Sequence, residues 1–160
     1  MGSEMCIRDS FSIEGEVRSD CAPLNGLVEE MLRTSLRIHA LRDPTRGGLA
    51  TVLWELAQAS GVGIVVEEES IPIREEVRGV CELLGYDPYY LANEGKLVAI
   101  LPEEEAPRVL EAMRSHPLGR EAAVIGEVRE EPKGRVLLKT RIGGHRLLEP
   151  LSGEQLPRIC

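Results

Sequence analysis

The chain has 160 residues, of which 42% are hydrophobic, 29% are charged and only 3% are aromatic, and its formal net charge is −8. This composition is typical of one globular domain with an aliphatic core, and it excludes a disordered chain. The acidic balance argues against a nucleic-acid partner, which would require clustered Lys and Arg. No apolar run approaches the ~20 residues of a membrane span, so we expect no membrane partner either.

In chain order the sequence predicts helix 24–32, strand 36–41, helix 43–60, strand 62–68, helix 73–84, strand 96–101, helix 103–113 and strands 122–128, 135–140 and 145–148. The helices are predicted from apolar residues at helical spacing, and the strands from alternation and short aliphatic runs. Asp43 and Thr45 are interpreted as capping residues of the second helix. The last two strands are expected to form a hairpin through Gly143 and Gly144. This order predicts an α/β fold, an α+β sandwich with a mixed sheet and packed helices.

The two ends of the chain lack such patterns. The first ten residues, MGSEMCIRDS, have no periodicity, and we interpret residues 1–10 as a non-native leader or junction. The α/β domain is then expected to cover residues 11–148. Residues 149–160 also lack a period and are predicted to form a flexible tail that ends in Cys160. On this interpretation the chain is a fragment of a longer protein.

The four cysteines, Cys6, Cys21, Cys81 and Cys160, form no CxxC pair. Small secreted disulfide scaffolds carry a higher density of cysteine, so we expect reduced thiols and a cytoplasmic location. Cys81 lies on an apolar helical face and is interpreted as a core residue. Cys21 precedes a helix and is interpreted as a buried helper rather than a nucleophile. The three histidines lack metal-ligand spacing, and we predict no metal site.

The segment DPTRGGLA is the first candidate site. A helix start with two glycines exposes backbone N–H groups, and Arg46 adds a positive charge, which favours an anion or phosphate. The segment is not a P-loop, because GxxxxGK[ST] is absent. The alternative is a capped helix whose glycines, Gly47 and Gly48, permit close packing.

The segment ANEGKL is the second candidate. Asn93, Glu94 and Lys96 stand together before a strand, and a carboxylate beside an amide and an amine is suited to acid–base chemistry. The alternative is a solvated turn. Cys160 is the third candidate, because a thiol on the last residue of a flexible arm is accessible and can move between sites. The alternative is a terminal cysteine without a role.

Five motifs occur in one order: SDCAPLNGLV, HALRDPTRGGLA, LANEGKLVA, HPLG followed by AAVIGEV, and a terminal GEQLPRIC. Together they resemble the C-terminal half of the HypE family of hydrogenase maturation factors, from about Phe11 to Cys160. That family belongs to the superfamily of aminoimidazole ribonucleotide synthetase and selenophosphate synthetase. The resemblance implies a synthetase-like C-terminal α/β domain. The N-terminal ATP-binding domain of the family has no counterpart in this chain.

The resemblance also implies a function. Cys160 would receive a carbamoyl group from the carbamoyltransferase HypF. An ATP-dependent dehydration would convert it to a thiocyanate, and the cyano group would pass to iron on the HypC–HypD complex. ATP and Mg²⁺ would be held mainly by the N-terminal domain, and the full-length protein would be a homodimer. This fragment alone is expected to be inactive.

The same resemblance assigns roles to the candidate residues. Glu94 would be the base that removes N–H protons, with Asn93 and Lys96 as possible helpers. The phosphates would be bordered from this side by Thr45, Arg46, Gly47 and Gly48. Three other interpretations stay open: a non-catalytic carbamoyl or cyano carrier, another ATP-dependent member of the superfamily, and a redox or metal-binding protein.

Overall fold

The computed structural model describes residues 19–151, and the structural statements below concern those residues. Four α-helices lie in this range: α2 (Asn25–Thr34), α3 (Gly48–Ser60), α4 (Glu75–Leu84) and α5 (Ala106–Ser115). The strands are β1 (Ala40–Arg42), β2 (Gly63–Glu67), β3 (Val98–Ile100), β4 (Gly126–Arg129), β5 (Val136–Lys139) and β6 (His145–Leu147). The predicted alternation of helices and strands is confirmed, as is the α/β class. Cys160 and the rest of the predicted tail from residue 152 lie outside the described residues.

The predicted mixed sheet is confirmed, and the strands also form a second, smaller sheet. Four strands form a mixed sheet in the order β4-β2-β5-β6, in which β2 runs parallel to β5 and antiparallel to β4. Strands β1 and β3 form an antiparallel two-stranded sheet of their own, with Leu41 opposite Ala99. The β5–β6 hairpin is confirmed: Thr140 N–H donates to Gly144 O over 2.8 Å.

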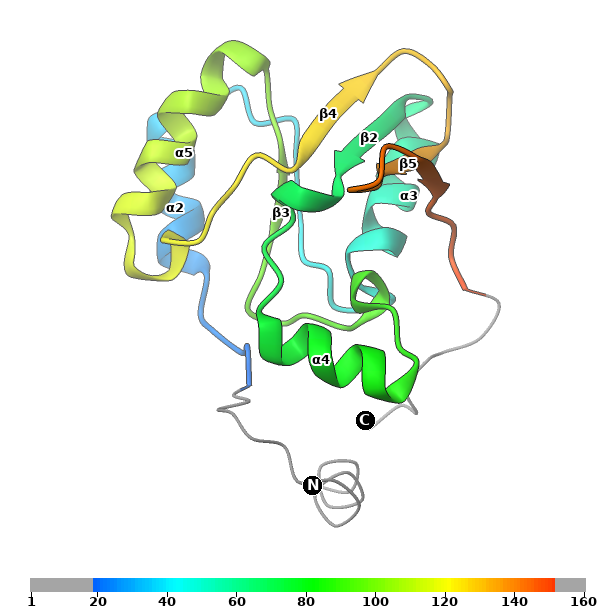
Figure 1. The fold of residues 1–160 in the computed structure, drawn as a ribbon. Coiled ribbons are helices and arrows are strands. Elements are labelled where there is room, and N and C mark those ends of the chain that lie inside the picture. Colours follow the sequence, from blue (N-terminus) through cyan, green and yellow to red (C-terminus); the bar gives the residue numbers. More distant parts are fainter. Residues whose placement is uncertain (1–18, 152–160) are drawn as a thin grey trace.

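The two-stranded sheet separates two hydrophobic cores. In the larger core, α3 packs on the four-stranded sheet through Leu53 and Ala57, against Val66 and Leu138. In the smaller core, α2 and α5 lie side by side, as Figure 1 shows in blue and yellow-green. Side chains of β3 and of the two residues that flank it alternate between the two cores: Val98 and Ile100 face the larger one, while Leu97, Ala99 and Leu101 face the smaller one. The period of two along a strand lets one short strand serve both cores.

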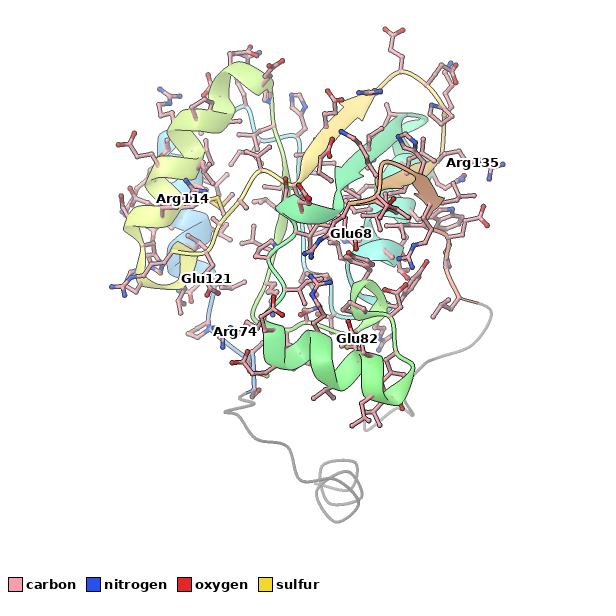
Figure 2. The ribbon with its side chains drawn as sticks, in the orientation of Figure 1. Glu68, Arg74, Glu82, Arg114, Glu121 and Arg135 are labelled. Atoms are coloured by element: carbon pink, nitrogen blue, oxygen red, sulfur yellow. The ribbon has the colours of Figure 1, made fainter. Side chains whose placement is uncertain are left out.

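An exposed ion pair also joins the segment before α4 to the segment after α5. Arg74, just before α4, lies 3.6 Å from the Glu121 carboxylate in the segment that follows α5; both residues are labelled in Figure 2. More than half of each side chain is exposed. An exposed pair of this kind contributes little to stability. Burial of the two cores around the two-stranded sheet therefore holds the fold together.

The second helix begins later than predicted. It starts at Gly48 rather than Asp43, its N-cap residue is Gly47 with φ 68°, and no side chain caps it. Asp43 and Thr45 are therefore not capping residues, and the capping prediction was wrong. The helix ends as predicted, at Gly61 with φ 65°. The strand predicted at 36–41 is confined to β1, and the strand predicted at 122–128 begins only at Gly126.

Replacing Met31 with Ala is expected to destabilise the domain by about 2–5 kcal/mol, because it leaves a cavity in the smaller core. Met31 belongs to α2 and is fully buried in this core, in one cluster with Val109 of α5. Leu36→Ala is the matched control, since the Leu36 side chain is 90% exposed and its truncation should change stability by less than about 0.5 kcal/mol. Urea unfolding of both variants measures the difference. Equal effects would contradict the assignment of Met31 to the core.

Candidate active site

The two candidate loops, 43–48 and 91–96, lie side by side. The backbone N–H of Asn93 donates to Pro44 O over 3.0 Å, which ties one loop to the other. The Thr45 hydroxyl also lies 3.4 Å from Asn93 O. A hydroxyl has one proton, and Thr45 donates it over the shorter 2.5 Å contact to Asp43. The backbone bond of Asn93 therefore carries the connection between the loops.

The glycine pair at the start of α3 permits close packing. Gly48 is buried and has φ 65°, a left-handed conformation that residues with a Cβ rarely adopt. A Cβ at this position would lie 2.6 Å from the carbonyl oxygens of both Tyr89 and Leu91. Close packing is therefore confirmed at Gly48, whereas the cap expected with it is not, because no side chain caps α3. The phosphate role predicted for residues 45–48 stays a prediction.

Asp43 and Arg46 give the first loop both signs of charge. The Thr45 hydroxyl bond holds the pKa of Asp43 below its usual range, so this carboxylate stays ionised. Arg46 is exposed, and it forms no ion pair with any other described residue. This loop therefore presents one cation that can meet an anionic group, beside a carboxylate that is already bonded.

Glu94 lies at the centre of a polar contact between two distant segments. The Cys21 thiol donates to Glu94 Oε2 over 3.2 Å. The backbone N–H of Glu94 donates to Asp20 Oδ2 over 3.1 Å, and Lys96 Nζ lies 3.0 Å from the same oxygen. Glu94 itself is exposed. Its carboxylate is thus both anchored and accessible, as a general base must be.

The structure changes the expected roles of three residues. Cys21 was predicted to be a buried helper, and that prediction was wrong, because Cys21 is exposed and contacts Glu94. Lys96 is engaged by Asp20 rather than by Glu94. The Asn93 side chain donates to Leu91 O over 2.7 Å, so in this structure it shapes its own loop.

Sequence reasoning missed Asp20. The residue stands in SDCAP, a motif that was recognised, but its partners lie 74 and 76 positions further along the chain. No periodicity or local spacing connects residues so far apart. The available signal was a carboxylate beside a cysteine, and that signal is too common to identify a site.

The ionisation of Asp20 depends on its partners. Partial burial raises its pKa, but the hydrogen bond and charge of Lys96 together with the backbone N–H groups of Glu94 and Gly95 outweigh burial, and the net pKa is lowered. A lowered folded-state pKa stabilises the protein above the ordinary pKa of Asp. This stabilisation is lost as the pH falls through the folded-state value.

Lys96→Met is therefore expected to raise the pKa of Asp20, because burial remains while the hydrogen bond and the charge are lost. Titration of side-chain carboxyl groups by carbon-13 NMR measures the shift. Lys139→Met is the matched control, since Lys139 pairs with Glu67 over 3.1 Å on the four-stranded sheet. The control should leave Asp20 unchanged. An unchanged Asp20 in Lys96→Met would contradict the ion pair.

A shallow hollow of about 400 Å³ lies beside Glu94. Its wall is apolar where α2 contributes Val28, and its rim is charged, with Arg42, Asp43, Glu94 and Lys96. Both candidate loops therefore border one accessible space. Within residues 19–151 no group of three or more His, Cys, Asp or Glu side chains is placed to hold a metal ion. No helix in the same range is long and apolar enough to cross a membrane.

Most of the chain matches one known protein family. The family model described as "AIR synthase related protein, C-terminal domain" matches residues 2–139, most of the chain. The chain belongs to this AIR synthase-related family. The predicted resemblance to HypE is also confirmed. The chain is 54% identical over 156 residues to the carbamoyl dehydratase HypE of Azotobacter vinelandii. The aligned residues cover 98% of this chain and 46% of that protein.

Two solved structures support the same assignment. A crystal structure of the hydrogenase maturation protein HypE in complex with ATP superposes with a TM-score of 0.87 at 49% identity, covering 96% of this chain and 47% of that one. A HypE–HypF complex superposes with a TM-score of 0.84 at 41% identity, covering 92% of this chain and 48% of that one. This AIR synthase-related domain thus spans about half the length of the relatives it matches, and it matches their C-terminal half.

Proposed function

We propose that this chain is the C-terminal part of an ATP-dependent carbamoyl dehydratase that acts in [NiFe] hydrogenase maturation. Identity of about half to proteins named carbamoyl dehydratase HypE supports the reaction class. The single observation on which the proposal rests is the setting of Glu94. Its carboxylate is exposed at the rim of a hollow and accepts a hydrogen bond from the Cys21 thiol, while its backbone N–H donates to Asp20.

The proposed reaction takes place on a carbamoyl group carried by the Cys160 sulfur. The carbamoyl oxygen is a poor leaving group, and transfer of the γ-phosphoryl group of ATP to it makes a good one. Phosphate then leaves with that oxygen, both N–H protons are removed, and the C≡N bond of a thiocyanate forms. The products are the thiocyanate, ADP and phosphate, which balances the atoms without an oxidant or reductant. Glu94 is the proposed proton acceptor.

The phosphate side of the reaction is assigned to residues 45–48. Arg46 is exposed and stands one residue before the N-cap of α3, where the positive end of the helix dipole favours an anion. The neighbouring Asp43 carboxylate would repel phosphates, so this loop suits the edge of a nucleotide site rather than its centre. We therefore propose that ATP and Mg²⁺ are held mainly by the part of the relatives that this chain does not cover.

One of the proposed partners is supported by a solved relative. The crystal structure of a HypE–HypF complex is known. We propose that a HypF carbamoyltransferase supplies the carbamoyl group to Cys160. A HypC–HypD complex would accept the cyano group on iron. We further propose a cytoplasmic homodimer for the full-length protein.

A carrier without dehydratase activity is the second candidate function for the chain by itself. It is favoured by one observation, the coverage of only 46% of the length of the Azotobacter vinelandii relative. The carrier would still present Cys160 to HypF, but it could not complete the ATP-dependent step.

Mass spectrometry of the intact chain and of its C-terminal peptide tests both functions, after incubation with HypF, carbamoyl phosphate and ATP. We expect one carbamoyl group on Cys160, without loss of water in this chain and with loss of water in the full-length protein. Cys160→Ser should accept nothing. An unmodified Cys160, alongside a full-length HypE that is modified, would refute the proposal for this chain.

A further inference from the structure

We propose that Asp20 and Cys21 are positioning residues for Glu94: Asp20 fixes the main chain of the 94–96 segment, and Cys21 orients the carboxylate. The inference rests on the proposed function, in which Glu94 is the base. Its physical basis is a set of contacts between two segments more than 70 residues apart. None of these contacts belongs to a helix or a strand.

Asp20 acts on the backbone. One carboxylate oxygen, Oδ2, accepts both the Glu94 N–H over 3.1 Å and the Lys96 ammonium over 3.0 Å. An ionised acceptor makes a stronger hydrogen bond than a neutral one. The two neighbours of Gly95, Glu94 and Lys96, are thereby held by the same carboxylate oxygen. The φ and ψ angles that aim the Glu94 side chain are restricted as a result.

Gly95 lets the two segments touch. A Cβ on Gly95 would lie 1.5 Å from the backbone oxygen of Asp20 and 3.0 Å from the backbone nitrogen of Ala22. Only a glycine permits this approach. The main chains are therefore in direct contact at the position that follows the proposed base, and Asp20 is within reach because of it.

Cys21 acts on the side chain. Its thiol donates to Oε2 of Glu94 over 3.2 Å. A carboxylate held through one oxygen keeps the lone pairs of the other oxygen for a proton from a substrate. The thiol of Cys21 is itself accessible, so the contact forms at the surface beside the hollow and not in the core.

Lys96 makes this arrangement electrostatically acceptable. Without it, the partly buried carboxylate of Asp20 would lose its cationic partner, and the pKa of Asp20 would rise. The ammonium of Lys96 neutralises Asp20 across a 3.0 Å ion pair. Asp20 can then hold the Glu94 main chain without adding an uncompensated negative charge.

The test compares removal with conservative replacement, in the full-length protein that carries this chain. Asp20→Ala should lower kcat for dehydration by about 10²-fold, the effect of a misplaced catalytic group, while the KM for ATP stays unchanged. Cys21→Ala should lower kcat roughly 2- to 10-fold, and Cys21→Ser, which keeps a donor, should recover most of that loss. Glu67→Gln is the control, because Glu67 pairs with Lys139 at the end of β2.

A second readout does not depend on catalysis. Amide hydrogen exchange at Glu94 should rise about tenfold or more in Asp20→Ala, because its acceptor is gone. The melting temperature reports whether a variant folds, and Asp20→Asn, which keeps an oxygen acceptor, replaces Asp20→Ala if the latter unfolds. Asp20→Asn should then lower kcat by less than about 10²-fold, because the acceptor is kept but its charge is lost.

The outcomes separate the two proposals. If the wild-type protein does not dehydrate its carbamoyl group, or if Glu94→Gln is fully active, the proposed function fails and the positioning role fails with it. If Glu94→Gln is inactive while the Asp20 and Cys21 variants keep the wild-type kcat, only the positioning role is overturned. Unchanged amide exchange at Glu94 in Asp20→Ala would overturn the contact itself. Equal losses in Cys21→Ala and Cys21→Ser would overturn the orienting hydrogen bond.

Discussion

Glu94→Gln is expected to lower the rate of ATP-dependent dehydration by about 10²- to 10⁴-fold, the range attributed to a positioned general base. The amide keeps the size of the carboxylate and can still accept from the Cys21 thiol, and the backbone bond to Asp20 is untouched. The site should therefore keep its shape while losing the group that accepts protons. Carbamoyl transfer to Cys160 should continue, because that step does not require this base.

Single-turnover dehydration of the pre-carbamoylated full-length protein measures this effect directly. Glu82→Gln is the matched control, since Glu82 is an exposed carboxylate on α4, labelled in Figure 2, and does not border the hollow. The control should react at the wild-type rate. A Glu94→Gln protein that dehydrates within a few-fold of wild type would remove Glu94 from the mechanism.

Gly48→Ala is expected to destabilise the domain by about 2–5 kcal/mol. The left-handed conformation at φ 65° costs an alanine roughly 1–2 kcal/mol, and forcing its methyl group into packed surroundings adds about 1–3 kcal/mol. The obstructing atoms are backbone atoms of residues 89–91, which cannot rotate away as the end of a side chain could. The same displacement would separate the 43–48 loop from Asn93.

Gly79→Ala is the control for this experiment. Gly79 lies within α4 with open space around the position of a Cβ, so alanine should stabilise the helix by up to about 1 kcal/mol. Urea unfolding of both variants gives the two free energies with opposite signs expected. Equal stability of Gly48→Ala and wild type would show that the 89–91 backbone moves freely, and it would contradict close packing at the start of α3.

Local patterns in the sequence were sufficient for most of the fold. Helical spacing located α2, α3, α4 and α5 and the last residues of α3 and α4, which are followed by Gly61 and Gly85 in the left-handed conformation that ends helices. The start of α3 was misplaced by five residues, because Asp43 and Thr45 match the capping pattern but bond to each other instead. Local propensity cannot distinguish a cap from such a turn.

The pairing of the strands could not be predicted from the sequence. The strands carry similar aliphatic patterns, and nothing local says which strand pairs with which. Strands β1 and β3 separate from the others because α2 and α5 form a second core, which the alternate side chains of β3 help to cover. That division is a property of packing between distant segments.

The candidate site shows the same limit. The sequence by itself determined which residues are candidates for the chemistry, since Glu94, Lys96 and the 43–48 loop were recognised from their residue types and from family motifs. Only the tertiary structure decided what those residues touch: Asp20 takes Lys96, Cys21 reaches Glu94, and Gly48 rests on the backbone of residues 89–91. The type of each residue is known from the sequence alone. Contacts between residues more than 70 positions apart depend on how the two cores pack around the two-stranded sheet of β1 and β3.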